Sequence, residues 1–363
     1  MVVTSAPEFD LVVVGGGIVG VTLALTALEQ DPEMRVLLAE AQWVGSGTTA
    51  RTAGLLTPVA RPGMHQMVER SLATYSRWLR ERPGLPLVDV PLAWVVPEER
   101  RDQFLAGFAG PPPVLADGSE ASPFRSAYPR VRLADDELVY IGAAAGWRAD
   151  GSGLAGGLAS MYLARGGICQ EGTRVDAVEV REDAVALRLG DGRILGSRVV
   201  ASCTGPWMVG GIGAGEAEER GTRVKKVAAL HFADRPDPGA PAVVFWDDDA
   251  FFLPFPERGY TLFSFFCDEW DCLPESASLS LTAEDREQGV TYVSRRNPDL
   301  AGRYCGGRAF CDAYPRDATP FVARNGSGRL LAVGGCSGSG IRVAPALADA
   351  AVEDVRKLLT CVP

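Results

Sequence analysis

The fold of this chain is decided by the stretch Asp10-Leu-Val-Val-Val-Gly-Gly-Gly-Ile-Val-Gly20. Its apolar start, residues 10–14, predicts a buried strand, and residues 18–30, after the glycines, have the composition of a helix. Residues 35–40 predict a second buried strand. A GxGxxG motif between a strand and a helix, followed by another strand, is typical of a Rossmann unit. We therefore expect a dinucleotide site at this turn.

The three glycines of the motif have separate mechanical roles. Gly15 permits the tight turn, Gly17 lets the backbone approach a pyrophosphate, and Gly20 lets the helix pack closely on the strand. The helix begins with Ile18 and Val19, where free N–H groups and the positive end of the helix dipole attract phosphate.

Glu40 ends the second predicted strand, about twenty residues beyond the motif, where this fold uses a carboxylate. A carboxylate at this position accepts hydrogen bonds from ribose hydroxyls and repels a 2′-phosphate, which argues against NADP. We include its neighbour Ala41 among the expected cofactor contacts.

The segment that follows, residues 45–56, reads GSGTTARTAGLL and favours FAD over NAD. Its small side chains would let the backbone approach a flat ring system, and its hydroxyl and N–H groups can bond ring heteroatoms. An NAD dehydrogenase would normally begin its next helix here. The expected contacts are Thr48, Thr49, Ala53, Gly54 and Leu55.

The remaining patterns predict an α/β protein with a Rossmann-type FAD-binding domain, whose parallel sheet is discontinuous in sequence, and an inserted mixed or antiparallel β-sheet substrate domain. We expect helices over 65–82, 154–165 and 344–359, strands over 173–180, 185–189, 198–202 and 330–333, and antiparallel sheet over 224–266. Residues 110–118, with three consecutive prolines, predict a loop. The expected domains are 1–85, 145–215 and 325–363 for FAD, and 86–144 and 216–324 for substrate.

Composition excludes several other classes of protein. The 363 residues have a formal net charge of −10, which argues against nucleic acid and an anionic membrane surface as partners. No apolar run approaches the ~20 residues that span a bilayer, and residues 1–9 lack a secretion signal, so we expect a cytoplasmic protein. The eight cysteines have no CxxC spacing and there are two histidines, so we expect reduced thiols and no metal site.

The sequence resembles the D-amino-acid oxidase superfamily of FAD-dependent oxidoreductases, and within it the glycine oxidase and sarcosine oxidase branch. Five segments carry the resemblance: the fingerprint with Glu40, residues 48–56, residues 199–207, Gly307-Arg308 with 317–322, and residues 334–345. The resemblance implies further FAD contacts at Val175, Thr204, Gly205, Trp207, Arg308, Gly338, Ser339, Gly340, Ile341 and Arg342.

The chemistry that the resemblance implies is hydride transfer from the carbon next to a substrate nitrogen to the flavin, followed by hydrolysis of the imine. A substrate carboxylate needs an arginine fork. The first candidate is Arg308, with Arg342 and Arg51 as the others. Where glycine oxidases have a substrate-binding tyrosine on the inserted sheet, this chain has Phe251 or Phe252.

Three departures from the family bear on the electron acceptor and on the cofactor linkage. The oxygen-activating lysine of sarcosine oxidases is replaced, since residues 262–265 (LFSF) occupy that strand and Lys225 and Lys226 lie on another, which puts O₂ in doubt. The family's loop histidine is replaced by Ser339. Some sarcosine oxidases bind flavin covalently through a cysteine near the position of Cys311, but the local spacing differs, so we expect non-covalent FAD.

The leading interpretation is an oxidase of glycine or an N-substituted glycine that yields an imine, then an oxo acid, an amine and H2O2. The aromatic residues of the inserted sheet hint at a substrate with a hydrocarbon portion, as in secondary metabolism. One alternative is an FAD dehydrogenase of proline-like or D-amino acids with an acceptor other than O₂. Another is a flavin-binding subunit without turnover. A homo-oligomer is possible in each case.

Overall fold

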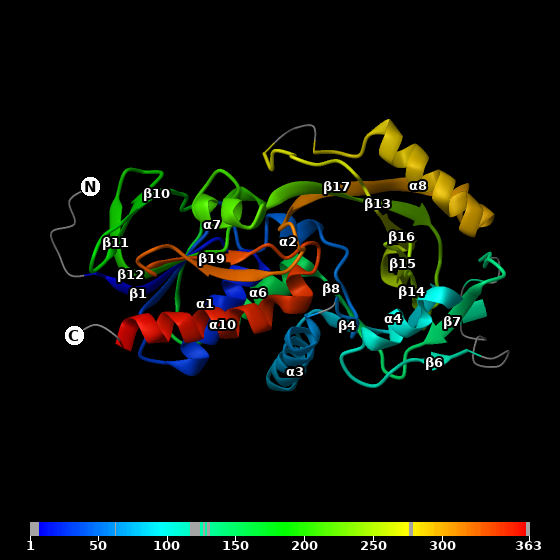
Figure 1. Cartoon of the computed structure of the whole chain (residues 1–363), viewed down its shortest axis with the longest axis horizontal. Coiled ribbons are helices and arrows are strands. Elements are labelled where there is room, and N and C mark those ends of the chain that lie inside the picture. The colour runs from blue at the N-terminus through cyan, green and yellow to red at the C-terminus, as the bar shows by residue number, and fades with distance from the viewer. Residues whose placement is uncertain are drawn as a thin grey trace.

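The computed structural model describes residues 7–61, 63–116, 124–125, 128, 131–275 and 279–360. The chain forms two halves, each built around a large sheet (Figure 1). The first sheet has the order β10-β11-β12-β1-β2-β9, with β19 beside β12 and β18 beside β19. Its strands are β1 (Phe9–Val14), β2 (Val36–Ala39), β9 (Ile168–Gln170), β10 (Val175–Val180), β11 (Val185–Leu189), β12 (Ile194–Ser202), β18 (Phe321–Arg324) and β19 (Leu330–Gly334).

The centre of this sheet is parallel, because β1 pairs in parallel with β2 and β12, and β12 with β19. Its strands are almost wholly apolar because helices cover them. Helix α1 (Ile18–Gln30) contacts α6 (Gly151–Ala164) and α10 (Gly340–Thr360), and α3 (His65–Glu81) packs on α10. Because α1 is enclosed by these neighbours and the sheet, its first eleven residues are all buried.

The second sheet has the order β17-β13-β16-β15-β14-β5-β7-β6. It is antiparallel except where β14 pairs in parallel with β5. Its strands are β5 (Leu92–Pro97), β6 (Val114–Leu115), β7 (Glu137–Ile141), β13 (Arg223–Ala233), β14 (Ala242–Phe245), β15 (Ala250–Phe255), β16 (Tyr260–Phe265) and β17 (Tyr304–Tyr314). A small third sheet contains β3 (Leu55–Leu56), β8 (Gly146–Ala149) and β4 (Leu87–Val90).

The remaining described helices are short apart from α8, which lies over the second sheet (Figure 1). They are α2 (Thr48–Arg51), α4 (Arg101–Ala106), α7 (Ala214–Glu219), α8 (Ala283–Arg296) and α9 (Pro298–Ala301), with 3-10 turns at Glu98–Arg100, Gly205–Met208 and Pro256–Arg258.

The second sheet has two faces with different neighbours. On β13 the even positions Ala228 and Leu230 pack in one apolar cluster with Val293 of α8. The odd position Ala229 packs in another cluster, together with Ala53 and Leu55 of the first half. Side chains alternate along a strand, so one face of this sheet is directed towards the segment 53–55 and the other towards α8.

The expected fold class is confirmed, and so is the helix at 18–30. Two local expectations were wrong. Residues 48–51 form a helical turn rather than a loop. Helix α10 begins at 340 rather than 344, since Pro345 in its second turn does not interrupt it. Strand β18 pairs with β19 in the first sheet.

Other expectations are partly outside the described residues. The predicted loop at 110–118 contains β6 at 114–115, and residues 117–118 are not described. Within the described part of the chain, no helix is long and apolar enough to cross a membrane. The division into two domains and the cytoplasmic location stay predictions.

Candidate active site

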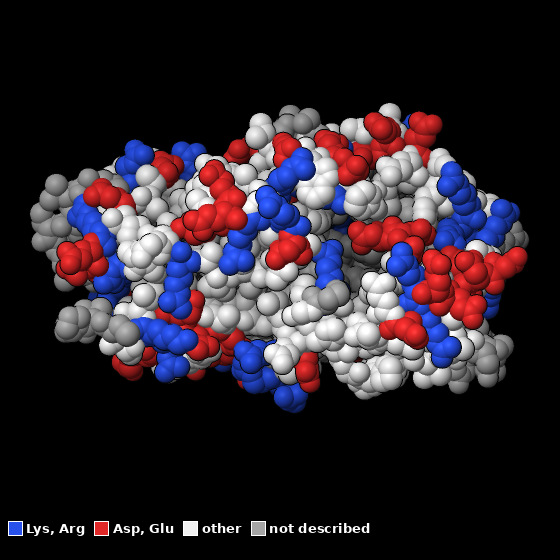
Figure 2. Space-filling view, in the orientation of Figure 1, with Lys and Arg blue, Asp and Glu red and all other residues white. Residues whose placement is uncertain are grey.

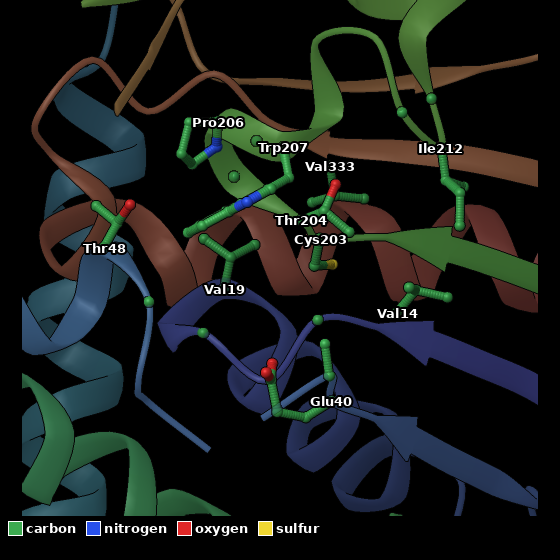
Figure 3. Close-up of a pocket in the computed structure, with 18 of the residues that line it drawn as sticks. Val14, Val19, Glu40, Thr48, Cys203, Thr204, Pro206, Trp207, Ile212 and Val333 are labelled. Atoms are coloured by element: carbon green, nitrogen blue, oxygen red, sulfur yellow. The ribbon is translucent and has the colours of Figure 1, made fainter. Parts of the chain in front are cut away.

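A cavity of about 1040 Å³ lies at the carboxyl ends of the parallel strands. Its walls include the last residues of β1, β2 and β19, which are Val14, Ala39 and Gly334, and Cys203 just beyond β12. This is the position at which open parallel sheets bind ligands. Figure 3 shows Val14, Val19, Glu40, Thr204 and Trp207 among the residues around it.

Most of the sequence-predicted cofactor residues line this cavity. They are Gly15, Gly17, Ile18, Val19, Glu40, Ala41, Thr48, Thr49, Val175, Thr204, Gly205, Trp207, Gly338, Gly340 and Ile341. The other candidates do not line it: Gly20, Arg51, Ala53, Gly54, Leu55, Phe251, Arg308, Ser339 and Arg342. The cavity is also lined by residues 210–216 and by Phe310 and Asp312 of β17, none of which was predicted, although the glycine-rich composition of 210–216 was a usable signal.

The fingerprint turn has the close backbone contacts that require glycine. Gly15 has φ 104°, and a Cβ there would lie 2.7 Å from the carbonyl oxygen of Cys203. The Glu40 carboxylate accepts hydrogen bonds from the N–H of Gly16 at 2.6 Å and of Gln42 at 2.8 Å. These bonds fix the carboxylate at the end of β2, on the wall of the cavity.

Thr49 contributes to the beginning of helix α1. Its Oγ1 accepts a hydrogen bond from the N–H of Ile18 at 3.0 Å, whereas the N-cap residue Gly17 has no side chain to do so. The segment after β2 is thereby tied to the glycine turn.

These residues fit FAD. The cavity extends from Val175 on β10, past the glycine turn, to Gly338 before α10. It combines a glycine cradle at a helix N-terminus, a fixed carboxylate, and a further wall of threonines and small residues for a ring system.

Strand β17 joins the second sheet to this cavity through three consecutive residues. The Cys311 carbonyl accepts from Thr48 Oγ1 at 2.9 Å, the Asp312 carboxylate accepts from the Gly338 N–H at 2.8 Å, and the Ala313 carbonyl accepts from the Ser337 N–H at 3.1 Å. Both walls of the expected flavin region, α2 and the loop before α10, are therefore held by one strand.

Asp312 is a buried carboxylate in the wall of the cavity. Burial raises its pKa to about 6, although hydrogen bonds from the Gly338 and Ala313 N–H groups oppose the shift. On this strand the resemblance pointed to Gly307-Arg308, and Asp312 was not predicted. An acidic residue within the apolar segment Phe310–Ala313 was the signal that could have identified it.

Arg308 contacts the segment after α2 and does not line the large cavity. Its Nη2 donates to the Thr52 carbonyl oxygen at 3.1 Å, and its buried Nε has no protein partner. It lines a separate cavity of about 100 Å³ that is also lined by Arg148, Asp150, Glu257 and Arg258. Burial lowers the pKa of Arg308, and the nearby Arg258 guanidinium acts in the same direction.

Arg342 lies in the first turn of α10, beside the loop that lines the large cavity. Its Nη2 donates to Ser339 Oγ at 2.8 Å, and its Nη1 donates to Thr57 Oγ1 at 3.2 Å and to the Val59 carbonyl at 3.0 Å. Burial lowers its pKa to about 10, and the charge of Arg61 adds to that shift. All three acceptors are neutral, so this partly desolvated cation is oriented but not neutralised.

The remaining candidates for substrate contact are Arg51 and one of the two phenylalanines, Phe251 or Phe252. Arg51 is exposed at the end of α2. Phe251, on β15, is half-buried in the cluster that contains Ala53 and Leu55. Phe252 is fully buried on the opposite face of the sheet, against Phe263. Of the two phenylalanines, Phe251 is therefore the one directed towards the first half of the chain.

Lys225 and Lys226 lie on β13 and not on β16, as expected, and they face opposite sides of the sheet. Lys225 is opposite Asp312 in the register. Its Nζ lies 3.6 Å from the ring centroid of Phe266 and 5.4 Å from that of Tyr314. Burial lowers the pKa of Lys225.

Lys226 is fully buried and binds Glu269 and Asp285, each at 2.8 Å. These two carboxylates and Cys267 are close enough together to hold a metal ion. Because the lysine already contacts and neutralises both carboxylates, we assign the group to the attachment of α8 and residues 267–269 to the sheet.

The geometry also bears on a covalent flavin link. Cys311 is opposite Lys226 in the register, and the cavity is lined by its neighbours Phe310 and Asp312 but not by Cys311 itself. Burial raises the pKa of the Cys311 thiol to about 12, which disfavours the thiolate.

Acid precipitation should therefore release all flavin from the wild-type protein and equally from Cys311→Ala. Yellow colour that stays with the wild-type pellet but not with the variant would contradict this.

Comparisons with known proteins agree with this site. Residues 10–353 match the sequence profile of the DAO family, described as FAD dependent oxidoreductase. The structure is similar to glycine oxidase from Geobacillus kaustophilus (TM-score 0.77, 19% identity, 97% of this chain and 95% of that one). It is also similar to L-proline dehydrogenase from P. horikoshii (TM-score 0.81, 19% identity, 97% of this chain and 94% of that one). A further similar structure is iminodiacetate oxidase from Chelativorans sp. BNC1 (TM-score 0.75, 17% identity, 96% of this chain and 95% of that one). A search of curated protein sequences finds no match.

The solved structures establish the fold, and the family profile covers nearly the whole chain, including the glycine turn and the cavity walls. The chain therefore belongs to the DAO family of FAD-dependent oxidoreductases.

Proposed function

We propose that this enzyme oxidises the C–N bond of an amino acid and that Arg342 holds the substrate carboxylate. The observation that carries the proposal is the state of Arg342, a partly desolvated cation with three neutral hydrogen-bond acceptors, adjacent to the cavity-lining Gly340 and Ile341. A carboxylate would supply the missing negative charge and accept from the guanidinium.

Bound FAD supplies the hydride acceptor, and the protein supplies binding and orientation. Ser339, Thr57 and the Val59 carbonyl fix the plane of the Arg342 guanidinium. That plane sets the direction in which a bound carboxylate, and hence the neighbouring C–N bond, is presented. Phe251 and Leu55 provide an apolar surface beside this region that would keep water from the reacting carbon.

Arg308 is the second candidate for the same role, since its buried Nε lacks a partner. We favour Arg342 because Arg308 lines a separate cavity of about 100 Å³, whereas Arg342 adjoins Gly340 and Ile341 of the large one. Arg51 is third, because an exposed guanidinium gains little from a carboxylate that it shares with water.

For the substrate we propose glycine or an N-substituted glycine, giving an imine and then an oxo acid, an amine and, with O₂ as acceptor, H2O2. The similarity to L-proline dehydrogenase as well as to glycine oxidase supports a second candidate, a dehydrogenase of proline-like or D-amino acids. Peroxide released with the best substrate favours the oxidase, and its absence with rapid reduction of an artificial acceptor favours the dehydrogenase.

The direct test is anaerobic bleaching of the flavin absorbance by a panel of amino acids and N-alkylglycines. We expect at least one amino acid to bleach it, and mass spectrometry of the released chromophore to show FAD. FMN or NAD in the chromophore would contradict the cofactor assignment. An FAD protein that no amine reduces would contradict the activity and leave a flavin-binding subunit as the function.

A further inference from the structure

Helix α10 contains a proline that removes one of the helix's own hydrogen bonds. In an α-helix, the carbonyl of each residue accepts from the N–H four residues later. Pro345 lies inside α10 and has no N–H, so the carbonyl of Ile341 in the first turn lacks its usual helical donor. Ile341 is buried, and a buried carbonyl without a donor is costly. This carbonyl therefore needs a partner from another element.

Helix α3 supplies that partner. The Tyr75 hydroxyl donates to the Ile341 carbonyl at 2.7 Å, and Tyr75 is fully buried. Burial raises the pKa of Tyr75, so its hydroxyl keeps its proton and remains a donor. One turn earlier in α3, the Oγ of the buried Ser71 accepts from the N–H of Ala346 at 3.2 Å. The two side chains are four residues apart and so lie on one face of α3.

Helix α3 is also attached to α1, the helix that begins at the glycine turn. Trp78 Nε1 donates to the Glu29 carboxylate of α1 at 3.0 Å, and Arg77 pairs with the same carboxylate at 2.7 Å. The ring of Trp78 packs edge-to-face against that of Tyr75, with centroids 5.6 Å apart. Figure 1 shows α3 beside the beginning of α10. The Tyr75 hydroxyl is therefore held on a support that is fixed to α1.

The first turn of α10 faces the cofactor cavity. Gly340 and Ile341 line it. The first N–H groups of a helix have no acceptor within the helix, and the positive end of the helix dipole lies there, so both are available to a bound cofactor. The Ile341 carbonyl and the Arg342 N–H belong to one peptide unit. A hydrogen bond to this carbonyl therefore fixes the direction of that N–H and strengthens it as a donor.

We propose that Tyr75 is a positioning residue for FAD, because its hydroxyl replaces the hydrogen bond that Pro345 removes and so holds the first turn of α10 against the cofactor. The proposal concerns cofactor binding and is independent of the substrate. The two hydrogen bonds from α3 join neutral groups inside the protein, whereas acidic and basic side chains intermix over the surface (Figure 2). Salt screens charges, so the contribution of the Tyr75 hydroxyl should not depend on salt concentration.

Tyr75→Phe tests this by removing only the hydroxyl. The Kd of FAD is taken from the rise in flavin fluorescence when the holoenzyme is diluted. We expect this Kd to increase at least ~10-fold, and equally at low and high salt. The absorbance spectrum of the flavin that stays bound should also change, because the N–H groups beside it are reoriented.

Tyr162→Phe is the matched control. It removes another buried tyrosine hydroxyl of the same half, which donates to the Val36 carbonyl at 2.7 Å and accepts from the Ile168 N–H at 3.0 Å. These partners are the first residues of β2 and β9, at the opposite end of the strands from the cavity. We expect a lower Tm with an unchanged Kd of FAD and an unchanged flavin spectrum. An unchanged Kd in Tyr75→Phe, or an equal increase in both variants, would overturn the proposal.

Pro345→Ala provides a rescue, because it restores an N–H four residues after Ile341. In this background the hydroxyl is dispensable, so Tyr75→Phe combined with Pro345→Ala should bind FAD as tightly as Pro345→Ala alone. The comparison is also valid where Tyr75→Phe alone does not fold. A double variant that binds FAD at least ~10-fold more weakly than Pro345→Ala would show that the hydroxyl does not act by replacing the missing helical bond, and would overturn the proposal.

Discussion

A Gly20→Ala protein should purify largely without FAD. The added Cβ would lie 1.9 Å from the carbonyl oxygen of Gly15 and 3.2 Å from Cβ of Cys203. Neither backbone nor a buried neighbour can move out of the way, so the beginning of α1 must shift from β1. That shift displaces the turn that cradles the phosphates. Overpacking of this kind costs roughly 1–3 kcal/mol in stability, and the loss of cofactor affinity adds to it.

The measurement is the ratio of flavin absorbance to protein, together with Tm in the presence and absence of added FAD. Gly156→Ala is the matched control. It places the same methyl group in another helix of the same half, where nothing lies within 4 Å. We expect full FAD content there and unchanged or higher Tm, since alanine favours a helix more than glycine does. A Gly20→Ala protein with full FAD content would show that the cofactor does not depend on this turn.

Replacing Arg342 by alanine should raise KM for the best amino acid about 100-fold or more, with FAD content unchanged. Removing one partner of a buried charge pair leaves the other desolvated, which costs ~3 kcal/mol. Arg342→Lys should restore part of the affinity, because an ammonium keeps the charge but cannot reproduce the planar fork. The same substitution at Arg308 is the discriminating comparison. If Arg308→Ala raises KM and Arg342→Ala does not, the carboxylate role belongs to Arg308.

The pH dependence of binding provides an independent check on Arg342. Its pKa is about 10, and a carboxylate binds its charged form. Affinity for methoxyacetate, which has no titratable amine, should therefore be present below pH 10 and be lost as the pH rises through that value. Kd values from flavin absorbance between neutral pH and pH 10.5 measure this. A flat profile would show that no group with a pKa near 10 governs binding of the anion.

Local sequence determined the cofactor half of the protein. The strand, glycine turn and helix over residues 10–30 depend on neighbours in the chain, because turn geometry, helix periodicity and close packing at Gly20 are set within a few residues. The same holds for Glu40, which follows its strand directly. These elements were predicted from residue type and spacing, and the cavity is lined by most of the side chains they contribute.

Only the tertiary structure decided which polar side chains share the site. On a strand, a shift of one residue changes the face on which a side chain lies, and this separates Lys225 from the buried, ion-paired Lys226. Pairing between β13 and β17 brings Asp312 opposite Lys225. Packing of α10 against the segment after β3 brings Arg342 to Thr57 and to the Val59 carbonyl, which are far from it in the chain. Sequence spacing carries no record of such long-range pairing, so the surroundings of Arg308 and Arg342 could not be compared before the sheets were assembled.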